Sequence, residues 1–238
     1  MSTLAKQNGI AIASIAKLNG IAKASIASLD GILMPASFPT VGAVNNGTDV
    51  ASGTSATVQL PASIASGDLL FIFMGSDSNT STLAAAGWTN LYNAGVNSHG
   101  HALYKIATGA EGATVAVTWS GNSAAVFYSM KVTTWHGTTP PEKGTLATGN
   151  SVSPDCPSLT PSWGSANTLW IAHAGTKGST QDFTVWPTSY TYTQYEIGSN
   201  GGLAVATRQV AASSQDPSAY TMTPTNNWDA ETIAVRPA

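Results

Sequence analysis

An eleven-residue repeat near the start of the chain constrains the fold more than any other feature of the sequence. The unit NGIAIASIAKL at 8–18 is followed by NGIAKASIASL at 19–29 and by the start of a third copy, DGI, at 30–32. Each copy opens with Asn-Gly or Asp-Gly, the dipeptides that favour two-residue β-hairpin turns. Because the two full copies contain no acid and no histidine, we assign the repeat to assembly and not to catalysis.

Two structures compete for this repeat. As an α-helix, its large apolar residues fall on one face with the hendecad spacing of a right-handed coiled coil. Against the helix, a glycine recurs in every copy, and glycine costs about 1 kcal/mol relative to alanine inside a helix. As strands, nine-residue segments alternate with turns, and Leu18 faces Ile21 across Asn19-Gly20. We favour short strands and turns.

The repeat is too narrow and too rich in alanine to bury its own large apolar side chains, whether it is helical or extended. We therefore expect it to pack on other chains or on the rest of this chain. The residues predicted to make these assembly or anchoring contacts are Ile10, Ile15, Leu18, Ile21, Ile26, Leu29 and Ile32.

The composition narrows the class of protein. Of the 238 residues only 9% are charged, about a third of the usual fraction, which suits an all-β protein that exposes hydroxyls and amides. A net charge of −3 with 9 Lys and Arg argues against nucleic acid as a partner. The single cysteine, Cys156, excludes a disulfide framework and a multi-cysteine zinc site, and we expect no cofactor.

Targeting signals are not expected either. Charged and amide residues interrupt residues 4–33, so we predict no signal peptide and synthesis in a cytoplasm. No run of 18 apolar residues occurs, so no membrane span is predicted.

From residue 57 onward the pattern becomes that of β-strands. Residues 34–56, rich in Gly, Pro and Asn, are interpreted as a linker or a wandering first strand. The predicted strands are Asp68–Met74, His101–Ala107, Thr114–Trp119, Ala124–Thr134, Thr168–Ala174, Leu203–Val210, Ala219–Thr223 and Glu231–Arg236.

A longer and weaker repeat relates the two halves of this region. Residues 56–75 align with 155–174 at an offset of 99, which places Leu70 on Leu169 and Ile72 on Ile171. Farther along, the offset is 103. We therefore predict an eight-stranded antiparallel, jelly-roll-like sandwich with internal duplication, spanning 57–238 with halves at 57–134 and 155–236, and preceded by the repeat segment 1–33.

The repeat resembles the SIAK(I/V)NGV tandem motifs that open many structural proteins of tailed phages. The body resembles a β-sandwich module of phage and bacterial surface proteins. Its marks are GDLL at 67–70, AGWT at 86–89, LYKIA at 103–107 followed by TG, TWSG at 118–121, and the closing IAVRPA. The resemblance implies a virion component such as a tail fibre, head fibre or decoration protein, and it brings no catalytic residue.

Residues with catalytic or metal-binding chemistry form no clear constellation in the sequence. His99 and His101 share one side of a strand and would bind a metal if Asp77 or His173 came near, but we interpret them as structural. The acids, among them Asp155, Asp182, Glu196, Asp216, Asp229 and Glu231, are scattered mainly among loops without the paired spacing of glycosidases. No G-x-S-x-G motif occurs, and Cys156 is interpreted as a packed or partly exposed thiol.

Aromatic residues in the second half offer an alternative function. Exposed Trp and Tyr rings beside amides bind the apolar faces of sugars, although packing in the core explains the same residues. The candidate glycan contacts are Trp186, Tyr190, Tyr192, Tyr195 and Trp228.

Taken together, the sequence predicts a non-enzymatic virion subunit that binds other virion proteins through 1–33 and forms a homo-oligomer, with a trimer as our guess. A module that binds host surface polysaccharide is the alternative. A polysaccharide depolymerase is the third and weakest hypothesis.

Overall fold

The computed structural model describes residues 37–77, 82–93, 99–178, 182–197 and 201–238, together with six two-residue strands between residues 6 and 33. The chain divides into two compact units, Met1–Ser37 and Phe38–Ala238. Within the described residues, no helix is long and apolar enough to cross a membrane.

The first unit contains three short hairpins whose pairing follows the eleven-residue repeat. The strands are β1 (Lys6–Gln7), β2 (Ile10–Ala11), β3 (Lys17–Leu18), β4 (Ile21–Ala22), β5 (Ser28–Leu29) and β6 (Ile32–Leu33). The innermost pairs are Gln7 with Ile10, Leu18 with Ile21, and Leu29 with Ile32. The pairing of Leu18 with Ile21 confirms the prediction of strands and turns over a helix. The described strands are two residues long, shorter than the nine-residue segments expected.

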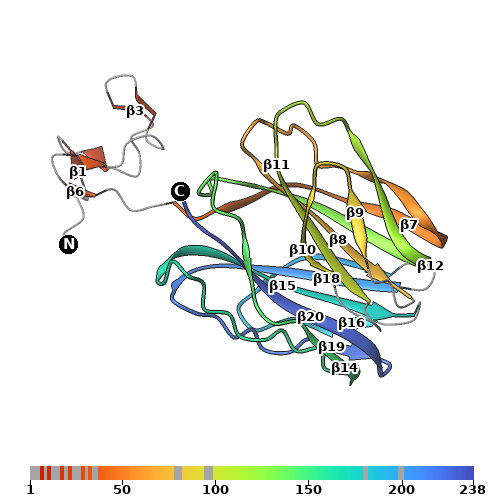
Figure 1. Cartoon of the computed structure of the whole chain (residues 1–238). Coiled ribbons are helices and arrows are strands. Elements are labelled where there is room, and N and C mark those ends of the chain that lie inside the picture. Colours follow the sequence, from red (N-terminus) through yellow and green to blue (C-terminus); the bar gives the residue numbers. More distant parts are fainter. Residues whose placement is uncertain are drawn as a thin grey trace. The chain divides into compact units, whose positions relative to one another are not determined.

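Two six-stranded antiparallel sheets form the second unit and pack face to face as two layers (Figure 1). The first sheet contains β7 (Thr40–Gln59), β8 (Leu69–Ser76), β9 (Leu83–Ala85), β10 (Thr89–Asn93), β11 (Gly100–Ile106) and β12 (Thr114–Thr133). The second contains β13 (Glu142–Lys143), β14 (Ala147–Ser151), β15 (Ala166–Lys177), β17 (Thr191–Ile197), β18 (Gly201–Ala212) and β20 (Asn226–Val235). A separate hairpin pairs β16 (Asp182–Val185) with β19 (Thr221–Thr223).

The predicted all-β sandwich is confirmed, with corrections to its details. The expected count of eight strands is too low, because each sheet has six strands within the described residues. The chain also completes one sheet before it enters the other, whereas the strands of a jelly roll pass back and forth between sheets. Residues 40–56, interpreted as a linker or first strand, form most of β7, which pairs with β12 at the edge of the first sheet.

The two sheets have the same strand order. The first runs β10-β11-β8-β12-β7, and the second runs β17-β18-β15-β20 and ends on β13 and β14. Phe73 of β8 pairs with Tyr128 of β12, and His173 of β15 pairs with Glu231 of β20. The two halves therefore correspond at an offset of 100 along β8 and β15 (73 to 173) and 103 along β12 and β20 (128 to 231).

This correspondence shows that the sequence alignment of β8 with β15 was one residue out of register. Leu169 and Ile171 lie in the core between the sheets, whereas Ile72 lies in the core on the outer face of the first sheet. A slip of one residue moves every side chain of a strand to the opposite face. The residues equivalent to Leu169 and Ile171 are therefore Leu69 and Phe71. That the halves arose by duplication remains a prediction.

Three apolar clusters cover the faces of the two sheets. The central cluster lies between the sheets and includes Phe71, Met130, Ile171 and Ile233. The outer face of the first sheet carries a second cluster around Trp119. On the outer face of the second sheet, the β16–β19 hairpin and residues 156–163 contribute to the third cluster. Each sheet is therefore buried on both faces, which explains why β8 and β15 are nearly continuous apolar runs.

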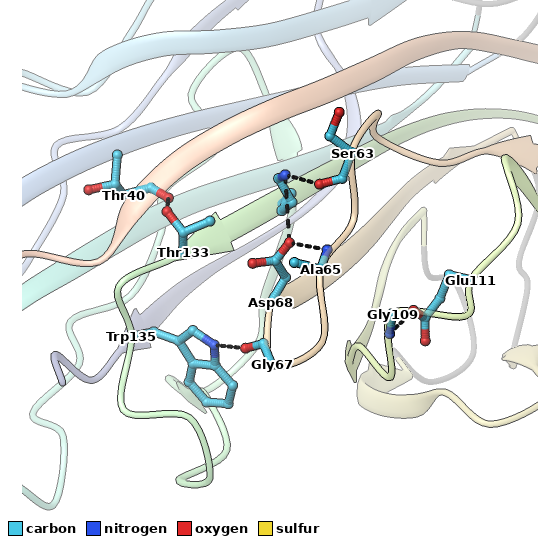
Figure 2. A network of polar contacts seen from close by, with 10 residues as sticks. Thr40, Ser63, Ala65, Gly67, Asp68, Gly109, Glu111, Thr133 and Trp135 are labelled. Carbon is cyan, nitrogen blue, oxygen red and sulfur yellow. Dashed lines mark hydrogen bonds and ion pairs between the residues drawn. The ribbon is translucent and has the colours of Figure 1, made fainter. Parts of the chain in front are cut away.

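Polar contacts of the GDLL motif hold the loop before β8 in place (Figure 2). Gly67 has a φ of +86°, a left-handed conformation that glycine adopts without strain. Its carbonyl accepts a hydrogen bond of 2.8 Å from the indole N–H of Trp135. The carboxylate of Asp68 accepts a hydrogen bond of 2.8 Å from the Ala65 N–H and lies 3.6 Å from the ammonium of Lys131. This motif is therefore structural.

Candidate functional site

The interior between the sheets narrows at one end until the two backbones touch. A Cβ atom on Gly75 of β8 would overlap the carbonyl group of Gly202 of β18. A Cβ atom on Gly175 of β15 would lie 2.5 Å from the Cα atom of Gly100 of β11. Facing sheets usually lie about 10 Å apart, so only glycine allows this approach. Polar side chains gather beside this contact.

Asp229 links the two sheets at the narrow end. Its side chain is buried, and one carboxylate oxygen accepts hydrogen bonds from the backbone N–H groups of His99 and Gly100, the latter at 3.0 Å. Asp229 belongs to β20 of the second sheet, whereas Gly100 begins β11 of the first sheet and His99 directly precedes it. The carboxylate thus satisfies buried backbone donors that would otherwise cost free energy.

His173 lies fully buried between the sheets. Its ring centroid is 5.0 Å from that of Phe73, and its Nδ1 atom shares a hydrogen bond with the hydroxyl of Tyr92 on β10. Its Nε2 atom has no hydrogen-bond partner among the described residues. Burial lowers the pKa of His173 to about 3, so the imidazole is neutral at physiological pH.

Glu231 lies directly opposite His173 in the pairing of β15 with β20. Side chains alternate along a strand, so Glu231 shares the inner face of β20 with Ile233 and Val235. Its side chain is 0% exposed, and its Oε1 atom lies 3.5 Å from Nζ of Lys143, whose side chain is 40% exposed. Burial raises the pKa of Glu231 to about 8, although Lys143 opposes the shift.

Tyr92 lies between His173 and the ion pair of Lys143 with Glu231, and it contacts both. Its hydroxyl bonds to His173, and the ammonium of Lys143 lies 5.8 Å from its ring centroid. The cluster of Tyr92, Lys143, His173 and Glu231, which we call the interior polar cluster, joins a neutral imidazole, a carboxyl group and an amine. This arrangement can hold or transfer a proton, and it places the side-chain nitrogen of Lys143 beside the carboxyl group of Glu231. In the part of the chain that the structure describes, no three His, Cys, Asp or Glu residues form a metal-binding group.

The aromatic residues predicted to contact glycans do not form an exposed platform where they are described. Tyr190 and Trp228 are only 9% and 8% exposed, in the cluster on the outer face of the second sheet. Trp186 is half-buried and packs edge-on against Tyr220 at a centroid distance of 5.5 Å. The prediction is therefore wrong for Tyr190 and Trp228. Tyr192 and Tyr195 lie on β17, but their side chains are outside the described residues.

The predicted assembly residues lie on the hairpins where they are described. Ile10, Leu18, Ile21, Leu29 and Ile32 belong to paired strands, and the structure does not describe their side chains. Ile15 and Ile26 lie outside the described residues. That these residues make assembly contacts stays a prediction.

Other predicted positions are structural. Cys156 is fully buried, which raises the pKa of its thiol, so it is the packed thiol expected. His99 and His101 are buried, and Nδ1 of His99 contacts the carbonyl of Ser76 at 3.0 Å. Burial lowers the pKa of both, that of His101 to about 4. His173 belongs to the other sheet and faces Tyr92.

Sequence reasoning missed the roles of Lys143, Asp229 and Glu231. Both acids were counted among scattered residues, with Glu231 at the start of a predicted strand, whereas they lie two residues apart on the inner face of β20. A signal was available, because Asp229 and Glu231 alternate with the apolar positions Trp228 and Ala230 just before a run of strand-forming residues. Nothing in the sequence marks Lys143, which reaches Glu231 only through the pairing of β13 with β20.

Comparison of the chain with protein-family models, with curated proteins and with solved structures found no match. The function is therefore inferred from the sequence motifs and from the geometry of the described residues.

Proposed function

We propose that this chain is a non-enzymatic structural subunit of a tailed-phage virion, as a fibre, decoration or adhesion protein anchored through residues 1–33. The observation that carries the proposal is the series of hairpins at eleven-residue spacing in a unit separate from the sandwich. The resemblance of the tandem motifs and of the sandwich module to phage structural proteins supports the assignment to a virion.

The energetics of the two units support different roles for them. An isolated two-stranded hairpin is at best marginally stable in water, and these hairpins have strands of two residues. In contrast, the sandwich has apolar clusters between its sheets and on both outer faces. The sandwich can therefore fold on its own core, and the repeat gains most from a partner surface in another subunit.

Truncation tests the role of the repeat. We expect the full chain to form an oligomer, with a trimer as the working model, and residues 34–238 to remain folded but monomeric, as measured by sedimentation equilibrium and circular dichroism. Residues 1–33 fused to a monomeric carrier protein should make that carrier associate. Equal association of the full and truncated chains would contradict the proposal.

Substitution within the repeat gives a matched control. Leu18→Asp with Ile21→Asp places two charges on one hairpin pair and should abolish association. Val152→Asp with Val185→Asp adds the same charge at exposed positions of the sandwich, which are 40% and 52% exposed, and should leave association unchanged. The virion assignment itself requires peptides of this chain in gradient-purified phage particles, and their exclusion from that fraction would contradict it.

A further inference from the structure

The pair of Lys143 and Glu231 has an unusual geometry for an ion pair. Lys143 pairs with Ile233 across β13 and β20, and Glu231 lies two residues before Ile233 on the same inner face. The lysine therefore reaches diagonally over the strand, and its Nζ atom stops 3.5 Å from Oε1 of Glu231. This distance is longer than a hydrogen bond between charged groups and places the amine in contact with the carboxyl group.

Apart from the ion pair with Lys143, Glu231 lacks the polar partners that usually stabilise a buried acid among the described residues. Neither of its carboxyl oxygens has a hydrogen-bond partner among the described residues. Burial of a carboxylate without hydrogen bonds is costly, and an ion pair offsets that cost only when the geometry is good. A buried polar group left in this condition calls for an explanation, such as a chemical role.

The surroundings favour the uncharged form of the Glu231 carboxyl group. The raised pKa of Glu231, about 8, makes the neutral acid accessible at physiological pH. The groups that face the pair are also uncharged, because the imidazole of His173 is neutral and the ring of Tyr92 lies beside the lysine. An amine and a carboxylic acid in contact are the reactants of amide formation.

We propose that Lys143 and Glu231 join in an intramolecular amide bond between β13 and β20. The step begins with transfer of a proton from the Lys143 ammonium to the Glu231 carboxylate within the pair. The Nζ lone pair then attacks Cδ of Glu231, which forms the C–N bond and a tetrahedral centre. The bond from Cδ to one oxygen breaks, and that oxygen leaves as water with the acid's proton and a second proton from Nζ.

The reaction is balanced without any further reagent. An ammonium and a carboxylate give one neutral amide and one water, and no oxidation occurs. The half-exposed side chain of Lys143 provides a route for the water to reach solvent. Two reacting groups fixed in one molecule have effective concentrations of up to about 10⁵–10⁸ M, which offsets the usual preference for hydrolysis.

The bond has a structural consequence for the second sheet. β13 is only two residues long and lies at the sheet edge, so its hydrogen bonds alone hold it weakly. An amide between β13 and β20 closes a long loop and restrains the unfolded chain, as a disulfide does in proteins that have a second cysteine. This chain has a single cysteine, so an amide supplies a cross-link that sulfur cannot.

The intact mass of the purified full chain tests the proposal. Under denaturing conditions, the natural chain should be lighter than its sequence mass by one water molecule. Lys143→Arg is the matched control, because it keeps the positive charge while its guanidinium, always protonated, cannot attack the carboxyl carbon. The variant should have its full sequence mass. A folded natural chain that also has its full sequence mass would overturn the proposal.

Peptide mapping distinguishes the loss of water in the proposed amide from a loss of water elsewhere in the chain. Asp30-Gly31 can lose water by closing a succinimide, but that loss would persist in Lys143→Arg and would overturn the proposal if it accounted for the whole difference. With the amide present, trypsin cannot cleave after Lys143. It should then release residues 132–177 joined to residues 209–238. A partial population of this joined peptide, absent from the variant, would support the proposal.

Discussion

The two sheets of the sandwich share one strand order but differ in chemistry at three corresponding inner positions. At corresponding positions the first sheet pairs Phe73 with Tyr128, and the second pairs His173 with Glu231. Beside them, Val126 of the first sheet corresponds to Asp229 of the second. Phe73 and Tyr128 stack with centroids 6.2 Å apart, whereas Glu231 lacks any hydrogen bond to its carboxyl oxygens among the described residues.

This contrast shows that backbone pairing tolerates very different side chains at the same place. The strand order and the glycines at the narrow end are common to both sheets, so we attribute the architecture to them. His173, Asp229 and Glu231 belong to the second sheet, whereas Phe73, Val126 and Tyr128 stand at the corresponding positions of the first. We therefore attribute to the polar residues of the second sheet a role in joining the sheets and in the proposed cross-link.

The largest effect is expected from a glycine position that both sheets share. In Gly75→Ala the new methyl group would overlap the backbone of Gly202, which cannot move without separating the sheets. We expect a loss of about 3 kcal/mol or more in the free energy of unfolding, the upper end of overpacking effects, measured by urea denaturation. Gly112→Ala is the control, because its nearest atom would be 3.9 Å away. Equal stability of the two variants would show that the close approach is not needed.

An intermediate effect is expected where the sheets differ. Tyr92→Phe removes the hydroxyl that satisfies Nδ1 of the buried His173 and should destabilise the fold by about 1–3 kcal/mol. Adding His173→Leu should recover part of this loss, because both polar atoms are then gone, as they are at Phe73 in the first sheet. If the double variant lost more free energy of unfolding than the two single variants together, the result would show that the two polar side chains are needed for packing. Chemical denaturation of all four proteins provides the cycle.

The smallest effect is a pH dependence that arises from His173 of the second sheet. His173 has a pKa of about 3 when folded and an ordinary value of 6.5 when unfolded, so below pH 6.5 only the unfolded chain gains this proton. Its contribution to stability is complete above pH 6.5 and decreases as the pH falls toward 3.

Relative to His173→Leu, the natural chain should therefore lose about 1 kcal/mol between pH 7 and pH 5.5. Urea midpoints at the two pH values measure this difference. The lowered pKa values of His99 and His101 also make the fold less stable as the pH falls. The raised pKa of Glu231 has the opposite effect in chains where Glu231 has not formed the amide. Comparison with the variant cancels their effects. A difference that does not change with pH would show that His173 is not shielded from solvent.

Much of the fold was predictable, whereas the candidate site was not. The Asn-Gly dipeptide predicted the pairing of Leu18 with Ile21, because a two-residue hairpin turn allows one register. The apolar runs located β8 and β15, but for most of β7 the prediction left open a linker or a first strand, because β7 is rich in Gly, Asn and Ser at a sheet edge, where few large side chains are needed. The interior polar cluster escaped because its members come from four strands far apart in the chain.

The sequence by itself determined the all-β class, the hairpins of the repeat and the positions of the long apolar strands such as β8 and β15, since these depend on turn residues and on local hydrophobic pattern. Only the tertiary structure decided which face of β8 and β15 meets the opposite sheet. Both faces of these strands are buried, so their side chains carry no alternation to read. It also decided that Lys143 meets Glu231, because that contact depends on pairing and burial between distant segments, and these set both the distance and the protonation of the two groups.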